Sequence, residues 1–340
     1  MRVRLKPLEE QVIVITGASS GIGLATALEA ARRGARLFLI ARDPEGLASA
    51  HSRCEAEGAE VEHLVADVGD HATVEMAAQQ AVERFGGFDT WVNNAGVSVY
   101  GELRDTPLDD ARDVFETNYW GVVHGSLVAA EHFRRRARGD GAYGGAIINI
   151  GSVESDRGVP LHGHYSASKH AVKGFTDVLR MELEKEGLPV SVTLIKPSAI
   201  NTPFPERSAN YMVEEAKLPE PTYAPEVVAR YVLDAAEHPV RDLTIGGKDG
   251  LIAKMGMVFP RLTDRFMEAT MFEQQKKDAP FVGDRHGTVD EPDPGSGHVH
   301  GTAEHELQSS LYTQVQRHPL AAASIALAAG AAVAALAGRN

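Results

Sequence analysis

A phenol and an ammonium group one helical turn apart are the first candidates for chemistry in this chain. Tyr165 and Lys169 lie in the stretch GHYSASKHAVKGF, residues 163–175, with only Ser, Ala and Ser between them. Side chains four residues apart are neighbours on a helix, and a nearby cation favours a phenolate over a phenol. An isolated pair of this type is usually a solvated surface contact, so the rest of the chain must decide whether this one does chemistry.

A glycine-rich loop near the N-terminus is the second candidate. The stretch TGASSGIG, residues 16–23, follows an apolar run and opens a helical pattern. In a dinucleotide-binding loop, Gly17 would allow the tight turn, Gly21 the close approach of the phosphates, and Gly23 the packing of the helix on the strand. The free N–H groups at a helix N-terminus attract an anion. The loop therefore predicts a pyrophosphate site, the alternative being a purely structural turn.

The end of the second apolar run bears on which dinucleotide binds. An acid there would bind the adenosine ribose hydroxyls of NAD(H), whereas an arginine accommodates the 2′-phosphate of NADP(H). The run ends LIARDP, with Ala41 where the acid is expected and Arg42 after it. This favours NADP(H) over NAD(H). Asp43 complicates the interpretation, and a solvated Arg42 is the alternative.

The elements that would position these residues alternate regularly along the chain. Short apolar runs with many β-branched residues occupy 11–17, 36–42, 60–67, 89–96, 145–152, 190–198 and 241–247, and helical spacing occupies 21–34, 44–58, 70–86, 107–138, 164–187 and 224–237. Continuous apolar strands are typical of a parallel sheet covered on both faces. The sequence therefore predicts an α/β fold, a doubly wound (Rossmann-type) parallel sheet of about seven strands with helices on both faces.

Composition excludes several classes of protein. The 340 residues are 43% hydrophobic, which is enough for a large buried core, and the net charge of −13 argues against a nucleic-acid partner. The single cysteine, Cys54, cannot form an intrachain disulfide and suits a reducing cytoplasm. The histidines after residue 278 lack the regular spacing of metal ligands, so no metal site is predicted.

Seven motifs in order make the chain resemble the short-chain dehydrogenase/reductase family over roughly residues 8–247. They are TGASSGIG, ADV at 66–68, NNAG at 93–96, Asn118 in ETNYWG, Ser152 in INIGS, YSASK at 165–169 and KPSAINT at 196–202. The resemblance implies hydride transfer between a nicotinamide cofactor and a secondary alcohol or carbonyl substrate. A catalytically silent dinucleotide-binding sensor, a 3-oxoacyl-type reductase and a steroid-like reductase are the alternatives.

The same resemblance implies a role for each catalytic residue. Tyr165 would be the general acid/base, and Lys169 would lower its pKa and bind the nicotinamide ribose. Ser152 would hold the substrate oxygen, and Asn118 would hold a water that relays protons from Lys169.

The resemblance also implies a set of cofactor contacts. These are Gly17, Ser19, Ser20, Gly21, Ile22, Gly23, Arg42, Asp67, Val68, Asn94, Ala95, Gly96, Tyr165, Lys169, Pro197, Ile200 and Thr202. One position departs from the family pattern. The family usually has Pro-Gly after the sixth strand, whereas this chain has Pro197-Ser198. Serine tolerates positive φ less well than glycine, which leaves the path of that loop less certain.

Substrate and assembly are less specified by the sequence. Phe204, Tyr211 and Met212, in the segment that usually forms the substrate lid, would line a pocket. The Met- and Phe-rich stretch 251–272, expected as two helices around Pro260, would enlarge an apolar pocket for a lipophilic substrate or, alternatively, cover a sheet edge or a subunit interface. The family usually pairs its active-site helices across a two-fold axis, which implies a homodimer or homotetramer. Apolar positions on these helices that could serve as core or interface are Val114, Val122, Val172 and Leu179.

The sequence predicts a catalytic domain at 8–280, followed by two further segments. Residues 281–318 are polar and predict a flexible linker. Residues 319–338 predict an Ala-rich helix. Within it, Leu320–Ala337 holds 18 uncharged residues, which at 1.5 Å per residue would span about 27 Å. This predicts a possible membrane anchor for a cytoplasmic enzyme, a soluble Ala-rich helix being the alternative.

Overall fold

A seven-stranded parallel sheet forms the centre of the molecule, in a computed structural model that describes residues 3–137, 143–291 and 297–317. The strand order is β10-β7-β6-β4-β1-β2-β3, and every adjacent pair is parallel. The predicted doubly wound α/β fold is confirmed. The Ala-rich segment 319–338, expected as a possible membrane anchor, lies outside the described residues.

The element bounds follow the sequence pattern closely. The strands of the main sheet are β1 Val12–Thr16, β2 Arg36–Ala41, β3 Val61–Val65, β4 Thr90–Asn93, β6 Gly145–Ile150, β7 Val190–Pro197 and β10 Asp242–Ile245. Two small sheets pair β5 Val99–Tyr100 with β8 Ala209–Asn210, and β9 Glu214–Ala216 with β11 Lys276–Pro280.

The bounds of the main helices also lie close to the ranges predicted from the sequence. They are α1 Gly21–Arg32, α2 Pro44–Ala56, α3 His71–Phe85, α4 Leu108–Phe115, α5 Gly121–Ala137, α6 Gly163–Lys185, α7 Phe204–Arg207, α8 Pro225–Glu237, α9 Gly247–Val258, α10 Pro260–Gln274 and α11 Leu311–Arg317. Short 3₁₀ turns span Leu8–Glu10 and Val153–Ser155. The helix predicted over 107–138 is divided by a π-helical turn at Glu116–Trp120, and α9 and α10 are the two pieces expected around Pro260.

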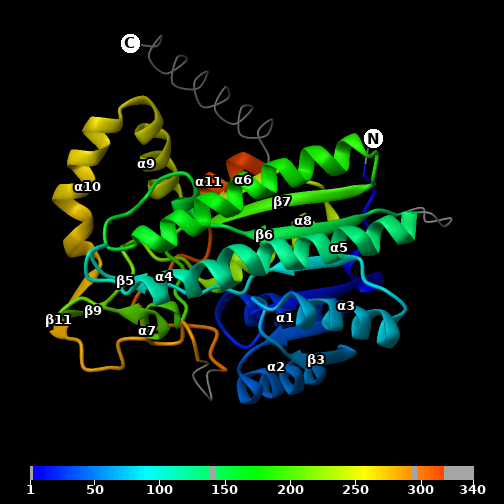
Figure 1. Cartoon of the computed structure of the whole chain (residues 1–340). Helices are drawn as coiled ribbons and strands as arrows, with labels where there is room; N and C mark the ends of the chain where they lie inside the picture. Colours follow the sequence, from blue (N-terminus) through cyan, green and yellow to red (C-terminus); the bar gives the residue numbers. More distant parts are fainter. Residues whose placement is uncertain (1–2, 138–142, 292–296, 318–340) are drawn as a thin grey trace, which may run out of the picture.

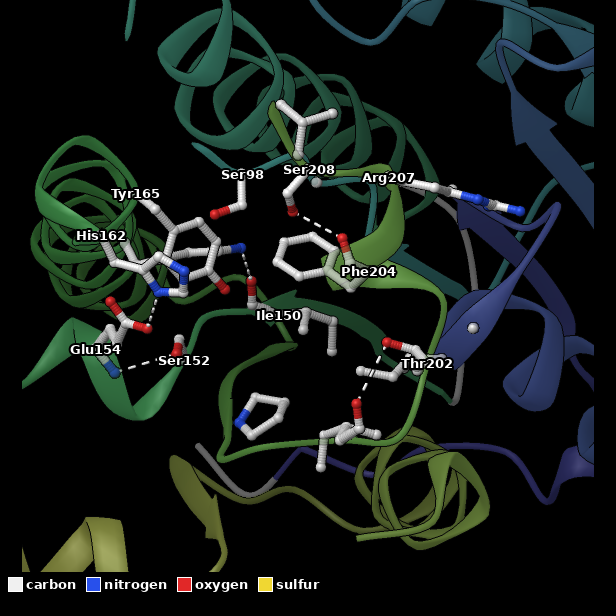
Figure 2. Close-up of a pocket in the computed structure, with 18 of the residues that line it drawn as sticks. Ser98, Ile150, Ser152, Glu154, His162, Tyr165, Thr202, Phe204, Arg207 and Ser208 are labelled. Atoms are coloured by element: carbon white, nitrogen blue, oxygen red, sulfur yellow. Dashed lines mark hydrogen bonds and ion pairs between the residues drawn. The ribbon is translucent and has the colours of Figure 1, made fainter. Parts of the chain in front are cut away.

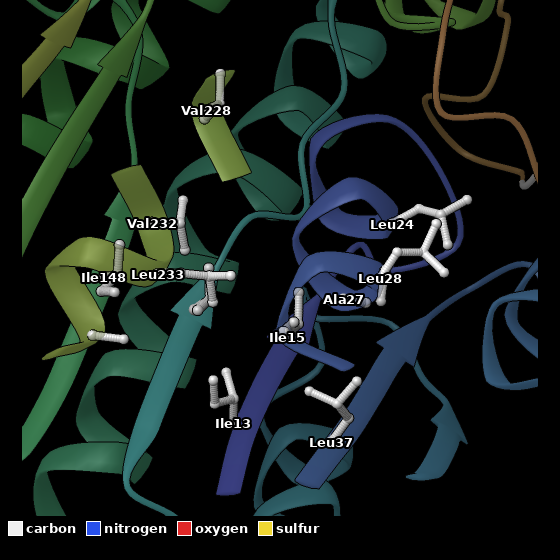
Figure 3. Close-up of a cluster of buried hydrophobic side chains, with 14 of the residues drawn as sticks. Ile13, Ile15, Leu24, Ala27, Leu28, Leu37, Ile148, Val228, Val232 and Leu233 are labelled. Carbon is white, nitrogen blue, oxygen red and sulfur yellow. The ribbon is translucent and has the colours of Figure 1, made fainter. Parts of the chain in front are cut away.

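Successive side chains along a strand point to opposite faces of the sheet, and each face has its own hydrophobic core. Ile13 and Ile15 of β1 face α1 and α8, where they pack with Leu24, Leu28 and Val232 (Figure 3). Val12 and Val14 point to the opposite face of the sheet, toward residues of α3, α5 and α6. Both faces of the sheet are therefore covered, which explains the continuous apolar runs.

The chain direction places a crevice at the carboxyl ends of the strands. From β1 the chain builds outward through β2 and β3, then returns to the other side of β1 with β4. Ligands of doubly wound sheets bind at such a reversal. Figure 1 shows α4, α7, β9, β11, α9 and α10 gathered at one end of the molecule.

Several residues of 281–318, the segment predicted as a flexible linker, contact the rest of the described chain. Val289 is buried in a small apolar cluster, and the backbone of Leu307 bonds Thr222 and Ala224. Helix α11 packs on β10, where Thr313 Oγ1 donates to the carbonyl of Thr244 at 2.8 Å. Several of these contacts are backbone hydrogen bonds, which leave no apolar signal in the sequence, and the linker stays a prediction.

Among the described residues, no helix combines the length and the apolar character needed to cross a membrane.

Candidate active site

A cavity of about 300 Å³ opens at the carboxyl ends of the strands. Every residue expected to contact the cofactor lines it except Gly23. Ser152, Tyr165 and Lys169 also line it, from the end of β6 and the first turns of α6. The structure thus brings together residues that lie more than 150 positions apart in the sequence.

The glycine loop has the geometry that a phosphate cradle needs. Gly17 and Gly21 have φ of 64° and 52°, which side chains rarely tolerate. A Cβ at Gly23 would lie 2.1 Å from the Gly17 carbonyl oxygen, so this glycine lets the helix pack against the loop. A Cβ at Gly17 would lie 2.7 Å from Ala95 Cα, and one at Gly21 would lie 3.2 Å from Thr202 Cβ, so glycine permits the close packing of this loop. The Gly21 amide donates to the His298 carbonyl at 2.9 Å, and the pyrophosphate site stays a prediction.

Tyr165 is partly buried, and groups other than Lys169 have the largest effects on its pKa. Burial and the negative charge of Glu154 raise its pKa above the usual value, while a hydrogen bond with Ser152 lowers it. Lys169 Nζ lies 5.6 Å from the centre of the phenol ring and donates to the Ile150 carbonyl at 2.9 Å. Burial and Glu154 dominate the pKa of Tyr165 in this arrangement, and the lowering effect of Lys169 stays a prediction.

Lys169 is itself perturbed. Burial lowers its pKa to about 8, although Glu154 acts in the opposite direction. With this pKa the ammonium is still mostly protonated at pH 7, but it releases its proton more readily than an ordinary lysine.

Asn118 lies in the π-helical turn and does not line the cavity. It is fully buried, and its side chain holds both backbone polar groups of Val97 at 2.9 Å and reaches Ser168 Oγ at 3.0 Å. These bonds tie the strand-end loop that carries Gly96 to helix α6. The observed hydrogen bonds show that Asn118 holds the Val97 backbone against Ser168, the residue before Lys169. The proton relay stays a prediction.

Arg42 and Asp67, both expected to contact the cofactor, line the cavity. The Arg42 guanidinium donates to the carbonyls of Thr288, Val289 and Asp290 at 2.6–3.2 Å. Asp43 Oδ1 accepts from two amides in the first turn of α2, so this acid caps a helix.

Apolar side chains from α7, α9 and α10 line another part of the cavity. Phe204 of α7 lies 5.7 Å from the Tyr165 ring, and Ile252, Met267 and Met271 of α9 and α10 complete the wall. Tyr211 and Met212, also expected in the pocket, lie elsewhere: the Tyr211 hydroxyl bonds Asp110 at 2.6 Å, and Met212 packs in a separate apolar cluster.

Ser198 needs no special backbone conformation. Leu161, with φ of 66°, is the only non-glycine residue with positive φ in the described part of the chain. The amide of Ser198 donates to the Ile245 carbonyl at 2.8 Å, and its hydroxyl bonds Asp249. The departure from the usual Pro-Gly is accommodated by an ordinary backbone path.

Sequence reasoning missed two buried residues of the same wall, Glu154 and His162. Glu154 follows Ser152 by two positions, and its amide donates to Ser152 Oγ at 3.1 Å. Its carboxylate bonds His162 Nδ1 at 2.9 Å (Figure 2). Their short sequence distance from Ser152 and Tyr165 was the available signal, since neighbours of catalytic residues often share their site.

Comparison with known proteins agrees with this geometry. The family model described as short chain dehydrogenase matches residues 11–211. The chain therefore belongs to the short-chain dehydrogenase family, and it is a dehydrogenase/reductase enzyme.

Particular relatives cover most of the chain. It is 42% identical over 327 residues to the "Uncharacterized oxidoreductase YxnA" of Bacillus subtilis, covering 95% of this chain and 90% of that protein. It is 39% identical over 198 residues to the "Granaticin polyketide synthase putative ketoacyl reductase 1" of Streptomyces violaceoruber, covering 58% and 70%. A crystal structure of a short chain dehydrogenase/reductase from Burkholderia phymatum in complex with NAD matches with a TM-score of 0.64 and 26% identity, covering 82% of this chain and all of that one.

Proposed function

We propose that the protein transfers a hydride between a nicotinamide cofactor and a secondary alcohol or carbonyl substrate, with Tyr165 as the general acid/base. The observation that carries the proposal is the placement of Ser152, Tyr165 and Lys169 in one cavity with the glycine loop. Oxidation of NADPH or NADH, followed at the nicotinamide absorbance band, should depend on an added carbonyl compound. No carbonyl-dependent oxidation across a panel of ketones with both cofactors would contradict the proposal.

Each side chain of the proposed site has a separate role in the reaction. When bound, the cofactor supplies the hydride chemistry. Ser152 holds the substrate oxygen next to the Tyr165 hydroxyl, with which it shares a hydrogen bond. Tyr165 gives its proton to that oxygen in reduction and removes it in oxidation. Lys169 stabilises the resulting negative charge and binds cofactor hydroxyls, while Asn118 holds the loop at Gly96 and the proposed proton-relay water.

For the cofactor we propose NADP(H) in preference to NAD(H). Ala41 ends β2 without a carboxylate, and Asp43 is engaged in capping α2. Arg42 is the cation next to the expected 2′-phosphate position, at the edge of the cavity. The Burkholderia relative contains NAD, so the preference has to be measured for this chain.

Arg42→Ala tests this preference. A charge-assisted contact contributes about 1.5–3 kcal/mol, so the variant should bind NADPH roughly 10- to 100-fold more weakly and NADH nearly unchanged. Fluorescence titration of both cofactors gives the two affinities. Arg53→Ala is a matched control, because Arg53 bonds the Gly297 carbonyl in the same region but does not line the cavity. Equal losses for both cofactors, or a wild-type preference for NADH, would refute the assignment.

For the substrate we propose a lipophilic carbonyl or alcohol. The wall formed by Phe204, Ile252, Met267 and Met271 supports it, since apolar surface favours an apolar ligand. A 3-oxoacyl-type substrate is the second candidate, favoured by the similarity to the Streptomyces ketoacyl reductase. A steroid-like substrate would use the same apolar wall. Steady-state kinetics with a 3-oxoacyl thioester, a steroid ketone and a medium-chain ketone would rank the three.

We also propose a homodimer or homotetramer that pairs α5 and α6. Val114, Val122, Val172 and Leu179, left open as core or interface, are buried within this chain and serve as core. The outer faces of the same helices expose Leu127, Val178 and Met181, which suits a subunit contact. Light scattering at micromolar concentration should give a multiple of the chain mass, and a strictly monomeric protein would contradict the proposal.

For the location, we propose a cytoplasmic catalytic domain, 8–280, held near a membrane by residues 319–338. Truncation after Arg317 should then move the protein from the membrane fraction to the soluble fraction and preserve its melting temperature. Truncation after Pro280 removes Val289 and α11 as well. Losing one buried aliphatic side chain costs about 1.5–3 kcal/mol, so its melting temperature should fall by at least about 3 °C. Full-length protein that is already soluble without detergent contradicts the anchor.

A further inference from the structure

Four buried polar atoms in the wall of the active-site cavity have no hydrogen-bond partner within the described ranges. They are Ser98 Oγ, the Tyr100 hydroxyl, Arg157 Nε and His162 Nε2, and all four residues line the cavity that holds Tyr165. Leaving a buried polar atom unpaired costs about 1–3 kcal/mol. Their shared position suggests that a polar group of a ligand pairs with them.

The Glu154–His162 pair determines whether the ligand group at His162 donates or accepts a hydrogen bond. Both residues are more than nine-tenths buried, at 8% and 7% exposure. Glu154 accepts from the Ser166 hydroxyl with one carboxylate oxygen and lies 2.9 Å from His162 Nδ1 with the other. An ionised carboxylate can only accept, so Nδ1 carries the hydrogen. In the neutral ring Nε2 then presents a lone pair, which accepts a hydrogen bond.

The imidazole ring is fixed in place by its neighbours. The Tyr100 ring stands edge-on to it with ring centroids 4.0 Å apart. The Tyr165 ring, on the other hand, can be followed in Figure 2 and has its centroid 5.5 Å from that of the imidazole. The preceding residue, Leu161, takes the unusual positive φ of 66° while its carbonyl accepts from the Gly101 amide at 2.9 Å. Backbone strain of this kind persists where the surrounding structure requires it, often at functional sites.

We propose that His162, oriented by Glu154, is a specificity-determining residue that accepts a hydrogen bond from a second hydroxyl of the substrate. The ring separation of 5.5 Å places this hydroxyl within about two carbons of the reacting carbonyl. The preferred substrates are therefore α- or β-hydroxy ketones in reduction, and 1,2- or 1,3-diols in oxidation. This inference rests on the proposed function and deepens it by naming the substrate class.

Matched ketones test the inference with the full-length protein and its preferred cofactor. The probes are 2-octanone, 3-hydroxy-2-octanone and 4-hydroxy-2-octanone, which share a chain that suits the apolar wall. The wild type should show kcat/KM about 10-fold higher for at least one hydroxy ketone than for 2-octanone, the value of one good hydrogen bond. His162→Phe should bring this ratio close to one.

His164→Phe is the matched control. Its Nε2 is also buried and unpaired among the described residues, but it lines a separate hollow with Leu108 and Phe115, outside the active-site cavity. The control should keep the wild-type ratio. If His162→Phe does not fold, His162→Asn replaces it, because asparagine is favoured at the N-cap position that His162 occupies before α6 and is too short to reach as far as the imidazole.

The outcomes separate the two proposals. Turnover of 2-octanone without any wild-type preference, or a preference that survives at His162→Phe or His162→Asn, overturns the subsite and leaves the proposed function standing. Turnover of none of the three probes, and of no ketone in the wider panel, contradicts the proposed function and the subsite with it. A preference lost only in the His162 variants supports the subsite.

Discussion

Replacing Tyr165 by phenylalanine should lower kcat by about 10²- to 10⁴-fold, the usual contribution of a general acid/base. The Tyr165 hydroxyl shares a hydrogen bond with Ser152 inside the cavity, and the variant removes only that hydroxyl. Because the ring is kept, cofactor affinity measured by fluorescence should change little.

Tyr211→Phe provides the control for this variant. Tyr211 also carries a hydrogen-bonded hydroxyl, paired with Asp110, but it does not line the cavity. It should keep near-native turnover. A Tyr165→Phe enzyme that turns over at the wild-type rate would remove Tyr165 from the mechanism.

Lys169→Met should weaken both cofactor binding and turnover, because the lysine is assigned two roles. Loss of a charge-assisted hydrogen bond of about 1.5–3 kcal/mol corresponds to a roughly 10- to 100-fold weaker cofactor affinity, with a further fall in kcat. The methionine side chain fills similar space, so the fold should survive. Cofactor titration and steady-state kinetics on the same preparation separate the two effects.

The pH dependence sharpens this prediction. Burial lowers the pKa of Lys169 to about 8, so its positive charge is present below that pH and lost above it. Wild-type cofactor affinity should therefore fall as the pH rises through about 8, and Lys169→Met should lack this step. Lys173→Met, one turn further along α6 and paired with Asp156, is the control and should behave as the wild type. A pH step that persists in Lys169→Met would show that another group titrates.

The sheet and the main residues of the cavity were predictable because their signals are local and regular. Apolar runs with β-branched residues gave the strands of the central sheet, and glycines that tolerate positive φ marked the phosphate loop. Tyr165 and Lys169 were found through their helical spacing. These features depend on a few neighbouring residues, which a sequence displays directly.

Features that depend on distant contacts were not predictable in the same way. Arg42 donates hydrogen bonds to the carbonyls of residues 288–290, almost 250 positions away in the sequence. The polar sequence of that segment gives no sign of these contacts. Similarly, the influence of Glu154 on Tyr165 depends on the turn that follows β6 folding back toward α6. Charge effects of this kind follow from burial and distance, which a motif does not contain.

The central claim is that the cavity passes a hydride from the cofactor to a carbonyl carbon while Tyr165 protonates its oxygen. The most direct measurement uses NADPH or NADH deuterated at the transferable position of the nicotinamide, a ketone substrate, and mass spectrometry of the alcohol product. The account predicts one deuterium on the carbinol carbon with the wild type and a collapse of labelled product with Tyr165→Phe. Product alcohol without deuterium, or equal labelling by the two proteins at equal rates, would contradict it.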